Sequence, residues 1–471
     1  MIILEKLDNN FIKITGQEWL YRELYDEFSF LCNGHQYSKA YKRKVWDGKI
    51  STFNKKNKTL YYGNYKKLIN FLKNKNYTYI DNVNHEYKDK DFSYLTKYTH
   101  FSPRDYQINC LNKCLKEKRK ISILNTGAGK SLIIFLLCCY FIENNITTLL
   151  IVPNTSLVEQ MYSDFCNYSN KLFVSKNVSR YYGKVKEKDK KVIISTYNSL
   201  ILKEESYFSK FGAVVVDECH SANSANSYKK ILLSCTNAEY RLGFTATLSE
   251  EKISRLVAEG LIGWAERFTN IEKLIKEKSL TDYKVNIIKL NYDCNFEGKS
   301  YGEQLEIISN YEPRNKFIVN LAKRVTKDTN NTLILLNRIE HGKILLELLR
   351  DTGKSFFIYQ NVTKEEREII KKILMDDFGY IIISTFNTFS TGINIPSLDN
   401  LIIASSTKSE IRLIQSIGRI LRKAENKNIS IVWDLQDCLD NCYFSNHAKE
   451  RNAIYKKENI KTEVIGKYYL R

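Results

Sequence analysis

The chain has 471 residues, of which 43% are hydrophobic, and it carries 73 lysines and arginines against 53 aspartates and glutamates, a net charge of +20. This length predicts about three domains at roughly 150 residues each, and the charge indicates a polyanionic partner such as nucleic acid. A composition rich in Lys, Asn, Tyr and Ile, as an AT-rich genome would encode, is the alternative explanation of the charge.

The eleven cysteines contain no CxxC pair, and several lie inside apolar runs, so we expect reduced thiols and neither a zinc site nor a disulfide framework. The longest apolar run, Leu132–Ile142, is about half of the ~20 residues that a membrane span needs. The N-terminal sequence MIILEKLDNN lacks the basic start and long apolar run of a signal peptide. We therefore expect a soluble cytoplasmic protein with no membrane partner.

Residues 1–95 are expected to form a small α+β domain, with helices at 18–30 and 65–73 and a hairpin turn at Asp47-Gly48. Between residues 35 and 75 there are twelve basic residues and one acid, with aromatic residues interleaved. Cations would meet phosphates and exposed aromatic rings could stack on bases, so this window predicts DNA binding. The candidate contacts are Lys42, Arg43 and Lys44. The alternative is a basic hairpin whose aromatic residues are simply core.

Short, continuously apolar runs then alternate with helical spans, first at 121–124, 148–152, 192–195, 213–216 and 241–244, and later at 332–336, 356–359, 380–384, 400–404 and 429–433. Continuous hydrophobicity indicates burial on both faces, which is typical of parallel sheets in α/β layer folds. We expect two such lobes, at 96–270 and 311–471, joined by an interlobe region at 271–310. A strand candidate at 283–292 could belong to the second lobe.

The stretch ISILNTGAGKSLII, residues 121–134, predicts a strand, a glycine turn and a helix. Glycines let backbone N–H groups face one anion, and the helix N-terminus adds partial positive charge. The nucleotide-binding candidates here are Thr126, Gly127, Gly129, Lys130 and Ser131. Lys130 would meet the β/γ-phosphates of ATP and Ser131 would hold Mg²⁺. The strict pattern GxxxxGK[ST] has glycine where this chain has Leu124, and a chance turn before a core helix is the alternative.

The sequence AVVVDECH, residues 213–220, is an apolar strand that ends in two acids. Adjacent carboxylates at a buried strand end are costly unless a cation or a proton offsets them. Asp217 would hold Mg²⁺ through water, and Glu218 would position and deprotonate the attacking water. A solvated loop start is the alternative.

A third motif, QSIGRILR at residues 415–422, places Gln415, Arg419 and Arg422 at i, i+4 and i+7 of an expected helix, and therefore on one face. A planar guanidinium suits the spread charge of phosphoryl transfer, so these residues are candidates for catalysis at the ATP phosphates. A surface helix with two arginines is the alternative.

TGAGKS, DECH, the TAT of residues 245–247 and QSIGRILR together resemble superfamily 2 helicases, over about residues 100–445. The resemblance implies two RecA-like lobes, ATP and Mg²⁺ as cofactors, and an adenine-reading segment FSPRDYQ with Arg104 and Gln107 at the nucleotide. It also implies that Gly392 and Asn394 approach the nucleotide. Strand-contacting residues would be Thr155, Thr196, Asn337 and Thr385. Residues coupling hydrolysis to lobe movement would be His220, Thr245 and Thr247.

The run from FSFLCNGHQYSKAYKRKVWDGKISTFN through TLYYGNYKKLINFL resembles the N-terminal domain of the UvsW-type phage helicases, and the second lobe is also similar to theirs. This family implies an ATP-dependent DNA helicase that migrates four-way junctions, regresses forks and dismantles displacement loops in recombination, repair and replication. Partners would be branched, duplex and single-stranded DNA, and possible phage recombination or replication proteins, in an infected bacterial cell. The alternatives are a double-strand DNA translocase that does not separate strands, an RNA helicase, and a nucleotide-dependent clamp without turnover.

Overall fold

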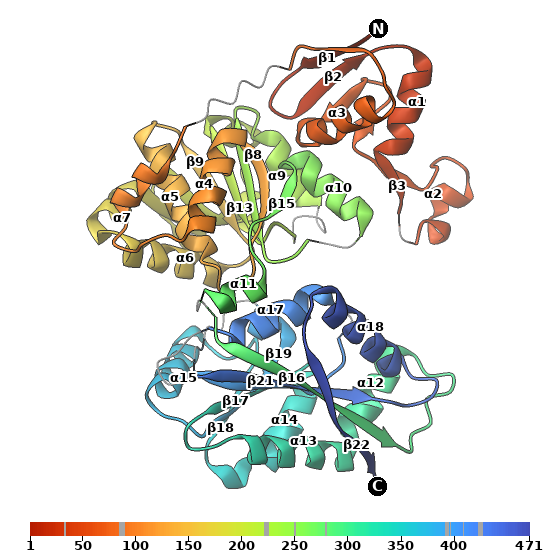
Figure 1. The fold of residues 1–471 in the computed structure, drawn as a ribbon, viewed down its shortest axis with the longest axis vertical. Coiled ribbons are helices and arrows are strands. Elements are labelled where there is room, and N and C mark those ends of the chain that lie inside the picture. Colours follow the sequence, from red (N-terminus) through yellow and green to blue (C-terminus); the bar gives the residue numbers. More distant parts are fainter. Residues whose placement is uncertain are drawn as a thin grey trace. The chain divides into compact units, whose positions relative to one another are not determined.

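The computed structural model describes residues 1–32, 34–83, 90–220, 226–248, 251–277, 280–390, 395, 397–407, 409–422 and 427–471 (Figure 1). The chain divides into two compact units. Residues 1–124 and 129–269 form the first, and residues 270–471 together with 125–128 form the second.

The N-terminal part of the first unit is a small α+β domain built on a five-stranded sheet in the order β5-β6-β2-β1-β7. Its strands are β1 (Ile2–Lys6), β2 (Phe11–Thr15), β3 (Ser29–Leu31), β4 (Lys49–Ser51), β5 (Phe53–Asn54), β6 (Thr59–Tyr61) and β7 (Tyr79–Asp81), and its α-helices are α1 (Glu18–Glu27), α2 (Lys39–Lys42) and α3 (Tyr65–Asn74). Strands β3 and β4 form a separate antiparallel pair.

Two local predictions for this domain are wrong. Residues 45–46 are not a strand, because β4 pairs with β3, Phe30 opposite Ile50, and the Asp47 side chain instead accepts a hydrogen bond from the N–H of Lys49 at 3.0 Å. The first helix ends at Glu27 rather than at residue 30, because residues 29–31 form β3. Long-range strand pairing thus overrode the local turn signal of Asp47-Gly48.

The rest of the first unit is a mainly parallel eight-stranded sheet in the order β11-β10-β12-β9-β13-β14-β8-β15, in which only the edge pair β10 and β11 is antiparallel. Its strands are β8 (Arg119–Ile123), β9 (Thr148–Val152), β10 (Val178–Tyr182), β11 (Val185–Lys186), β12 (Val192–Thr196), β13 (Ala213–Asp217), β14 (Tyr240–Thr245) and β15 (Ala265–Arg267), and its α-helices are α4 (Asp105–Glu117), α5 (Lys130–Glu143), α6 (Thr155–Tyr168), α7 (Lys171–Asn177), α8 (Tyr197–Leu200), α9 (Asn226–Ser234) and α10 (Lys252–Leu261). Every residue of β9, β12, β13 and β14 is buried, which confirms the parallel-sheet prediction.

The N-terminal domain is docked on this sheet domain through buried polar contacts. Arg241 of β14 is buried, and its Nη2 donates to Asn10 Oδ1 at 2.6 Å and to Cys235 O at 2.7 Å. Leu256 of α10 belongs to the hydrophobic core of the N-terminal domain, and Tyr61 belongs to that of the sheet domain. The two domains therefore share apolar core rather than a solvated junction.

The second unit is a seven-stranded, entirely parallel sheet in the order β18-β19-β17-β20-β21-β16-β22. Its strands are β16 (Asp282–Tyr292), β17 (Asn331–Leu336), β18 (Ser355–Ile358), β19 (Ile381–Thr385), β20 (Leu398–Ile403), β21 (Ile429–Asp437) and β22 (Thr462–Leu470), and its α-helices are α11 (Ile271–Lys276), α12 (Tyr301–Asn310), α13 (Glu312–Val325), α14 (Ile339–Leu348), α15 (Lys364–Asp376), α16 (Phe386–Ser390), α17 (Glu410–Ile420) and α18 (Tyr443–Lys457). The candidate strand at 283–292 is β16, inside this sheet.

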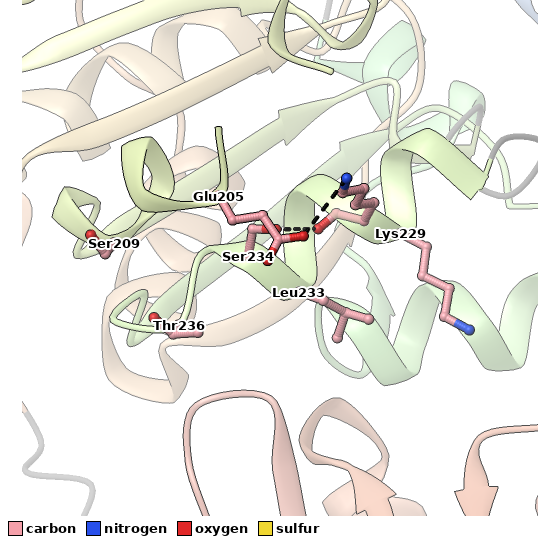
Figure 2. Close-up of a pocket in the computed structure, with 7 residues that line it drawn as sticks. Glu205, Ser209, Lys229, Leu233, Ser234 and Thr236 are labelled. Atoms are coloured by element: carbon pink, nitrogen blue, oxygen red, sulfur yellow. Dashed lines mark hydrogen bonds and ion pairs between the residues drawn. The ribbon is translucent and has the colours of Figure 1, made fainter. Parts of the chain in front are cut away.

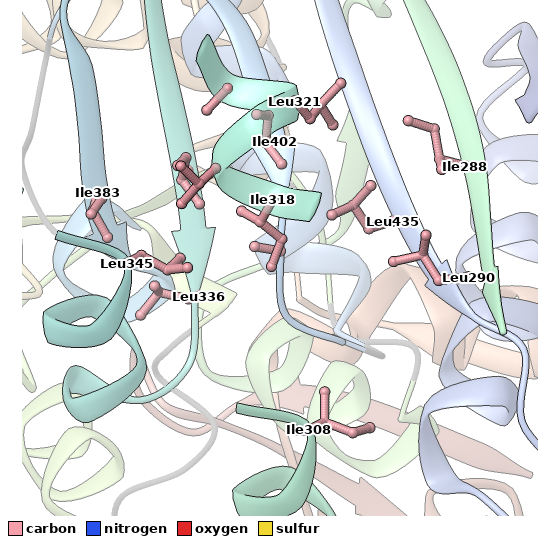
Figure 3. Close-up of a cluster of buried hydrophobic side chains, with 14 of the residues drawn as sticks. Ile288, Leu290, Ile308, Ile318, Leu321, Leu336, Leu345, Ile383, Ile402 and Leu435 are labelled. Atoms are coloured by element: carbon pink, nitrogen blue, oxygen red, sulfur yellow. The ribbon is translucent and has the colours of Figure 1, made fainter. Parts of the chain in front are cut away.

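Helices α12, α13 and α14 pack on the second sheet through the cluster of Figure 3, where Ile318 and Leu321 meet Leu435, Ile402 and Leu290. These side chains come from β16, β20, β21 and α13 and are buried. The two parallel-sheet lobes with a small N-terminal α+β domain are the fold class that the sequence predicted.

Candidate nucleotide and nucleic-acid site

The phosphate-loop candidate lies at the carboxyl end of β8 and leads into α5. Gly127 and Gly129 have φ values of +84° and +73°, and Gly129 is the residue before the first turn of α5. Left-handed backbone of this kind favours glycine, and it lets successive N–H groups point toward one bound anion. The helix start adds its partial positive charge, so the loop is suited to phosphate.

Lys130 and Glu218 form an ion pair in this structure, with Lys130 Nζ 2.9 Å from Glu218 Oε1. His220 Nδ1 lies 3.2 Å from Glu218 Oε2. Burial opposes the charged form of Glu218, but the positive charge of Lys130 and the hydrogen bond from His220 outweigh it and hold the pKa of Glu218 well below its usual range. Glu218 is therefore an ionised carboxylate, as a general base must be.

The backbone of Glu218 is also unusual, with φ +49° in a residue that is not glycine. The left-handed conformation costs an ordinary side chain on the order of 1–2 kcal/mol. Such strain persists only where surrounding contacts over-determine it, and it is concentrated at functional sites. The two contacts from Lys130 and His220 are such restraints.

Asp217 precedes Glu218 at the end of β13 and is buried. Among the described residues, none hydrogen-bonds to its Oδ1, and burial together with the neighbouring Glu218 carboxylate raises the pKa of Asp217 to about 6. A buried carboxylate oxygen without a partner fits a cation. Asp217 and the Ser131 hydroxyl are oxygen donors of the kind that Mg²⁺ prefers, so these residues fit the predicted metal.

The three coupling candidates are joined to this site by hydrogen bonds. His220 Nδ1 lies 2.9 Å from Thr245 Oγ1, and Thr245 Oγ1 donates to the carbonyl of Thr247 at 2.6 Å. A continuous path thus runs from Lys130 through Glu218 and His220 to the end of β14. The structure thus places His220, Thr245 and Thr247 next to one another and next to Glu218. Their role in coupling hydrolysis to lobe movement stays a prediction.

Gln107 packs against the phosphate loop. Its Nε2 donates to the carbonyl of Gly129 at 3.4 Å, and its Oε1 accepts from the backbone N–H of Arg104 at 2.8 Å, which closes a capping box at the start of α4. The Arg104 guanidinium donates to the Tyr106 hydroxyl at 2.9 Å. Gln107 is thus fixed by a contact with the loop itself, and Arg104 is fixed by contacts within the start of α4.

Sequence reasoning missed Tyr168, whose hydroxyl lies 2.6 Å from Ser131 Oγ. Tyr168 also makes an edge-on contact with the Phe101 ring, at 5.6 Å between centroids. It is the last residue of α6, 37 positions after Ser131, and no local pattern marks it. Only the fold brings it to the phosphate loop.

The strand-contacting candidates lie in pairs at the carboxyl ends of neighbouring parallel strands. In the first unit, Thr196 ends β12 and Thr155 begins α6 just beyond β9, and Thr196 pairs in register with Val152. Thr196 Oγ1 lies 3.0 Å from Ser199 Oγ.

In the second unit, Thr385 ends β19 opposite Leu336 of β17, and Asn337 follows directly. Thr385 Oγ1 donates to Thr388 Oγ1 at 2.9 Å, and Asn337 Nδ2 donates to Ser406 O at 2.7 Å. Each pair therefore shares one edge of its sheet, where ligands of open α/β sheets bind.

The motif at 415–422 differs from its prediction. Helix α17 ends at Ile420, so Arg422 lies beyond the helix, where it forms an isolated bridge with Leu280, and the one-face expectation is wrong for Arg422. Gln415 and Arg419 are on the helix, and Arg419 Nη1 donates to Phe389 O at 2.6 Å. Gly392 and Asn394 lie outside the described residues.

The basic candidates of the N-terminal domain are exposed. Lys42 ends α2, and Arg43 and Lys44 follow it. Within the part of the chain that the structure describes, no acidic side chain pairs with any of the three. Three adjacent solvated cations are suited to phosphate contacts.

A hollow of about 590 Å³ in the first unit, shown in Figure 2, lies away from this chemistry. Ser209 and Thr236 line it just before β13 and β14 begin, so it is at the amino edge of the sheet, opposite the phosphate loop. Glu205 and Lys230 form an ion pair across it at 3.7 Å. It contains none of the predicted site residues.

The structure has two parallel-sheet lobes and a phosphate loop. It also has an acid pair at the end of β13 that is linked through His220 to Thr245 at the end of β14. Together these features define a two-lobed ATPase of the helicase type. Family models agree: "Type III restriction enzyme, res subunit" matches residues 100–250, "Helicase conserved C-terminal domain" matches 314–424, and "DNA helicase UvsW, N-terminal" matches 2–81.

Among curated proteins, the chain is 31% identical to the ATP-dependent DNA helicase uvsW of Enterobacteria phage T4, over 98% of this chain and 94% of that protein. It is 27% identical to a putative ATP-dependent RNA helicase of Acanthamoeba polyphaga mimivirus, over 83% and 73%. The crystal structure of T4 UvsW aligns over 100% of both chains at 28% identity, with a TM-score of 0.53. A fragment of a putative HsdR restriction subunit from Vibrio vulnificus, at 17% identity, covers 81% and 71% with a TM-score of 0.58, which shows the shared fold. The chain belongs to the UvsW family of helicases.

Two further observations concern the described residues only. None of their helices is both long and apolar enough for a membrane span. They contain no group of three or more His, Cys, Asp or Glu side chains placed to hold a metal ion together.

Proposed function

We propose that this protein is an ATP-driven DNA helicase that translocates on DNA and remodels branched structures, namely four-way junctions, forks and displacement loops. The observation that carries the proposal is the match of the UvsW N-terminal model to residues 2–81, on the same chain as the hydrogen-bonded path from Lys130 to Thr247. Any helicase motor would explain the hydrogen-bonded path from Lys130 to Thr247. The UvsW-type N-terminal domain is the feature that favours branched DNA as the substrate.

The ATP chemistry follows from groups in the first unit. Lys130 exchanges its partner Glu218 for phosphate oxygens when ATP binds at the loop, and backbone N–H groups of residues 127–130 hold the β-phosphate. Ser131 and Asp217 would hold Mg²⁺, which would supply charge neutralisation at the phosphates. Glu218 orients the attacking water and takes its proton at a carboxylate oxygen. Gln107 and Arg104 bind the base side of the nucleotide.

The path from Glu218 to Thr247 is proposed to couple hydrolysis to movement. When the partners of Glu218 change, His220 and Thr245 must adjust, because one nitrogen, His220 Nδ1, faces both Glu218 and Thr245. Thr155, Thr196, Asn337 and Thr385 are proposed to hold the phosphate backbone of the tracked strand. Gln415, Arg419 and Arg422 are proposed to act on the transferring phosphate, and Gly392 and Asn394 to approach the nucleotide.

The N-terminal domain, residues 1–95, is proposed as a second DNA-binding site, with Lys42, Arg43 and Lys44 on phosphates. The lobes at 96–270 and 311–471 are proposed to form the motor, together with residues 271–310, whose strand and helices belong to the second unit. Recognising a branch requires that one arm is held while another is pulled. The shared core with α10 makes the N-terminal domain a fixed extension of the first lobe. DNA is the proposed substrate, with phage recombination or replication proteins as partners in an infected cell.

A double-strand translocase without strand separation is the second candidate, and the match of residues 100–250 to a restriction-enzyme motor favours it. ATP-dependent strand displacement on a forked and on a blunt duplex separates the two. The proposal expects displacement on the fork, and hydrolysis without displacement on either substrate would support the translocase instead. Stimulation of hydrolysis by RNA but not by DNA would contradict both.

A further inference from the structure

A cavity of about 530 Å³ opens in the second unit, among side chains of α12, α16, α17 and α18 and the ends of β17 and β20. Its volume lies within the roughly 300–1,000 Å³ of typical ligand pockets. It lies at the carboxyl edge of the parallel sheet, where open α/β sheets bind ligands. The strand-contacting candidate Asn337 lines it, and Phe386 and Asn387 line it directly after Thr385. The cavity therefore borders the proposed path of the DNA strand.

Two tyrosines at helix starts form an aromatic wall of this cavity. Tyr301 begins α12 and Tyr443 begins α18, and both remain exposed, at 37% and 46%. Their rings meet edge-on at 5.9 Å, and the Tyr301 ring also lies 5.6 Å from the His447 ring. Exposed rings beside a pocket offer flat apolar faces, and nucleic-acid bases stack on such faces without regard to sequence.

Another part of the lining is polar and includes a cation, Arg412. The Arg412 guanidinium is exposed, and among the described residues no acidic side chain pairs with it. Ser409 caps α17 by accepting the N–H of Arg412 at 3.3 Å. Glu410, the acid in this first turn, is paired with Lys457 at 2.9 Å. A guanidinium beside a helix start is suited to a phosphate group.

Buried hydrogen bonds fix the floor of the cavity. Ser406 is 4% exposed, its hydroxyl lies 2.7 Å from His447 Nδ1, and its carbonyl accepts from Asn337 Nδ2 at 2.7 Å. These contacts tie α18 to the ends of β17 and β20. The cavity is thus a built site, because its polar floor is held by its own hydrogen bonds rather than by solvent.

We infer that this cavity is a nucleotide seat, which takes one nucleotide of single-stranded DNA with its base against Tyr301 and Tyr443 and its phosphate at Arg412. The inference rests on the proposed function and adds a base contact to the backbone contacts proposed there. In this arrangement the second lobe holds a strand by one stacked base as well as by phosphates. The seat uses α12 and α18, which carry none of the helicase motifs.

The test measures binding of the full chain to fluorescein-labelled dT12 and to a phosphate-matched abasic 12-mer, by anisotropy and without ATP. We expect Tyr443→Ala to weaken binding of dT12 by roughly fivefold to 150-fold, since one stacked base contributes about 1–3 kcal/mol, and to leave the abasic strand nearly unchanged. Arg412→Ala should weaken both strands and make the slope of log K against log salt shallower by ~0.7. Tyr469→Ala and Arg350→Ala, exposed residues outside the cavity, are the matched controls.

Equal losses on both strands for Tyr443→Ala, or no loss, would overturn the base contact. Arg412→Ala remains a test of the seat if Tyr443→Ala does not fold. Binding of free dTMP to the parent that is lost in Arg412→Ala, while dT12 binding is unchanged in both Tyr443→Ala and Arg412→Ala, would assign the cavity to a free nucleotide and also overturn the inference. Stimulation of the parent ATPase by dT12 is measured in parallel. If dT12 stimulates the parent ATPase but the Tyr443→Ala and Arg412→Ala variants bind dT12 as tightly as the parent does, only the inference about the cavity is refuted. If no DNA stimulates the parent ATPase, the proposed function is refuted.

Discussion

Glu218 is the residue on which the account of hydrolysis depends most. It combines an ionised carboxylate, a left-handed backbone and contacts with both the phosphate-loop lysine and His220. A solvated loop start would lack the contacts with Lys130 and His220. The geometry therefore favours the catalytic interpretation of DECH over that alternative.

Substitutions at Lys130 and Glu218 should separate ATP binding from turnover. We expect Lys130→Ala to weaken ATP binding and abolish turnover, because the alanine side chain cannot reach the phosphates. Glu218→Gln should bind ATP and hydrolyse it very slowly, by a factor of about 10²–10⁴ for loss of a general base. Equilibrium ATP binding and phosphate release measure the two effects. Unchanged ATP affinity in Lys130→Ala would refute the phosphate-loop assignment, and a parental rate in Glu218→Gln would refute the base.

Local sequence patterns predicted the phosphate loop and the acid pair Asp217-Glu218. Each of these features is encoded by a few consecutive residues: glycines that adopt positive φ, or acids directly after an apolar strand. Tyr168 could not be found in this way, since its contact with Ser131 joins the end of α6 to the start of α5. Arg422 was misplaced because helical spacing was extended two residues past the end of α17 at Ile420.

At the scale of elements, α14 and α13 are joined by a buried histidine. His341 is 1% exposed, its Nε2–H donates to Asn315 Oδ1 at 2.9 Å, and its Nδ1 has no partner among the described residues. Burial, with a smaller effect of the nearby Arg314 charge, lowers the pKa of His341 to about 3. The folded protein therefore holds this imidazole neutral.

This histidine should make the stability of the protein depend on acid. The pKa of His341 is lowered in the folded state, so the unfolded chain, with a pKa near 6.5, takes up the proton first as pH falls, and stability is lost between about pH 6.5 and pH 3. From about pH 7 to pH 5 the loss should be about 2 kcal/mol. Urea unfolding of parent and His341→Gln at both pH values measures it. The variant should lose about 2 kcal/mol less, and an identical pH dependence would contradict the argument.

Gly63 lies where the backbone of the N-terminal domain comes close to the backbone of α10. It lies in the short 3₁₀ helix Tyr62–Asn64, where a Cβ would lie 1.9 Å from the carbonyl oxygen of Glu259 and 2.6 Å from that of Gly260. Backbone atoms on both sides cannot yield as a flexible side chain can. This position therefore requires glycine to keep the two domains docked.

We expect Gly63→Ala to lower the free energy of unfolding by about 1–3 kcal/mol, as overpacking does. Thermal or urea unfolding of the full chain measures the effect. Gly302→Ala is the matched control, because a Cβ there would meet only Arg338 Nη2, at 4.0 Å. A Gly63→Ala variant as stable as the control would show that the docked arrangement is wrong.

Hydrophobic runs predicted the main parallel strands because strands buried on both faces are continuously apolar. They did not predict β10, β15 or β22. Strand β22 is at the sheet edge and mostly exposed, so its sequence carries little hydrophobic signal. The prediction of a hairpin at residues 45–50 is wrong because β4 pairs with β3, which lies about 20 residues earlier in the chain. The residues of a turn carry no information about such a pairing.

At the scale of the whole molecule, the N-terminal domain and the first lobe share a hydrophobic core. This shared core decides which experiment can test DNA binding by the N-terminal domain. Deleting residues 1–95 would uncover Leu256 and remove Asn10 from the buried Arg241, whose pKa is lowered to about 10 by burial. We therefore expect that a chain starting near residue 96 does not keep the fold of the first lobe. Substitution of exposed residues is therefore the cleaner test.

We expect charge reversal of Lys42, Arg43 and Lys44 to weaken junction binding, with little effect on the melting temperature, because all three are solvated. Every phosphate that these cations no longer neutralise should make the slope of log K against log salt shallower by ~0.9 on duplex DNA. Reversal of Lys343, an exposed lysine of the second unit, is the control. Junction binding across a salt series with an unchanged slope would mean that these cations do not meet DNA.

The most direct measurement of the central claim is ATP-dependent conversion of a labelled four-way junction, with the parent, Glu218→Gln and the charge-reversed N-terminal variant side by side. We expect the parent to convert the junction only with ATP, Glu218→Gln to bind the junction without converting it, and the charge-reversed variant to convert it poorly while retaining DNA-stimulated hydrolysis. A parent that hydrolyses ATP on DNA but leaves junctions and forks intact would show that this protein is not a branch-remodelling helicase.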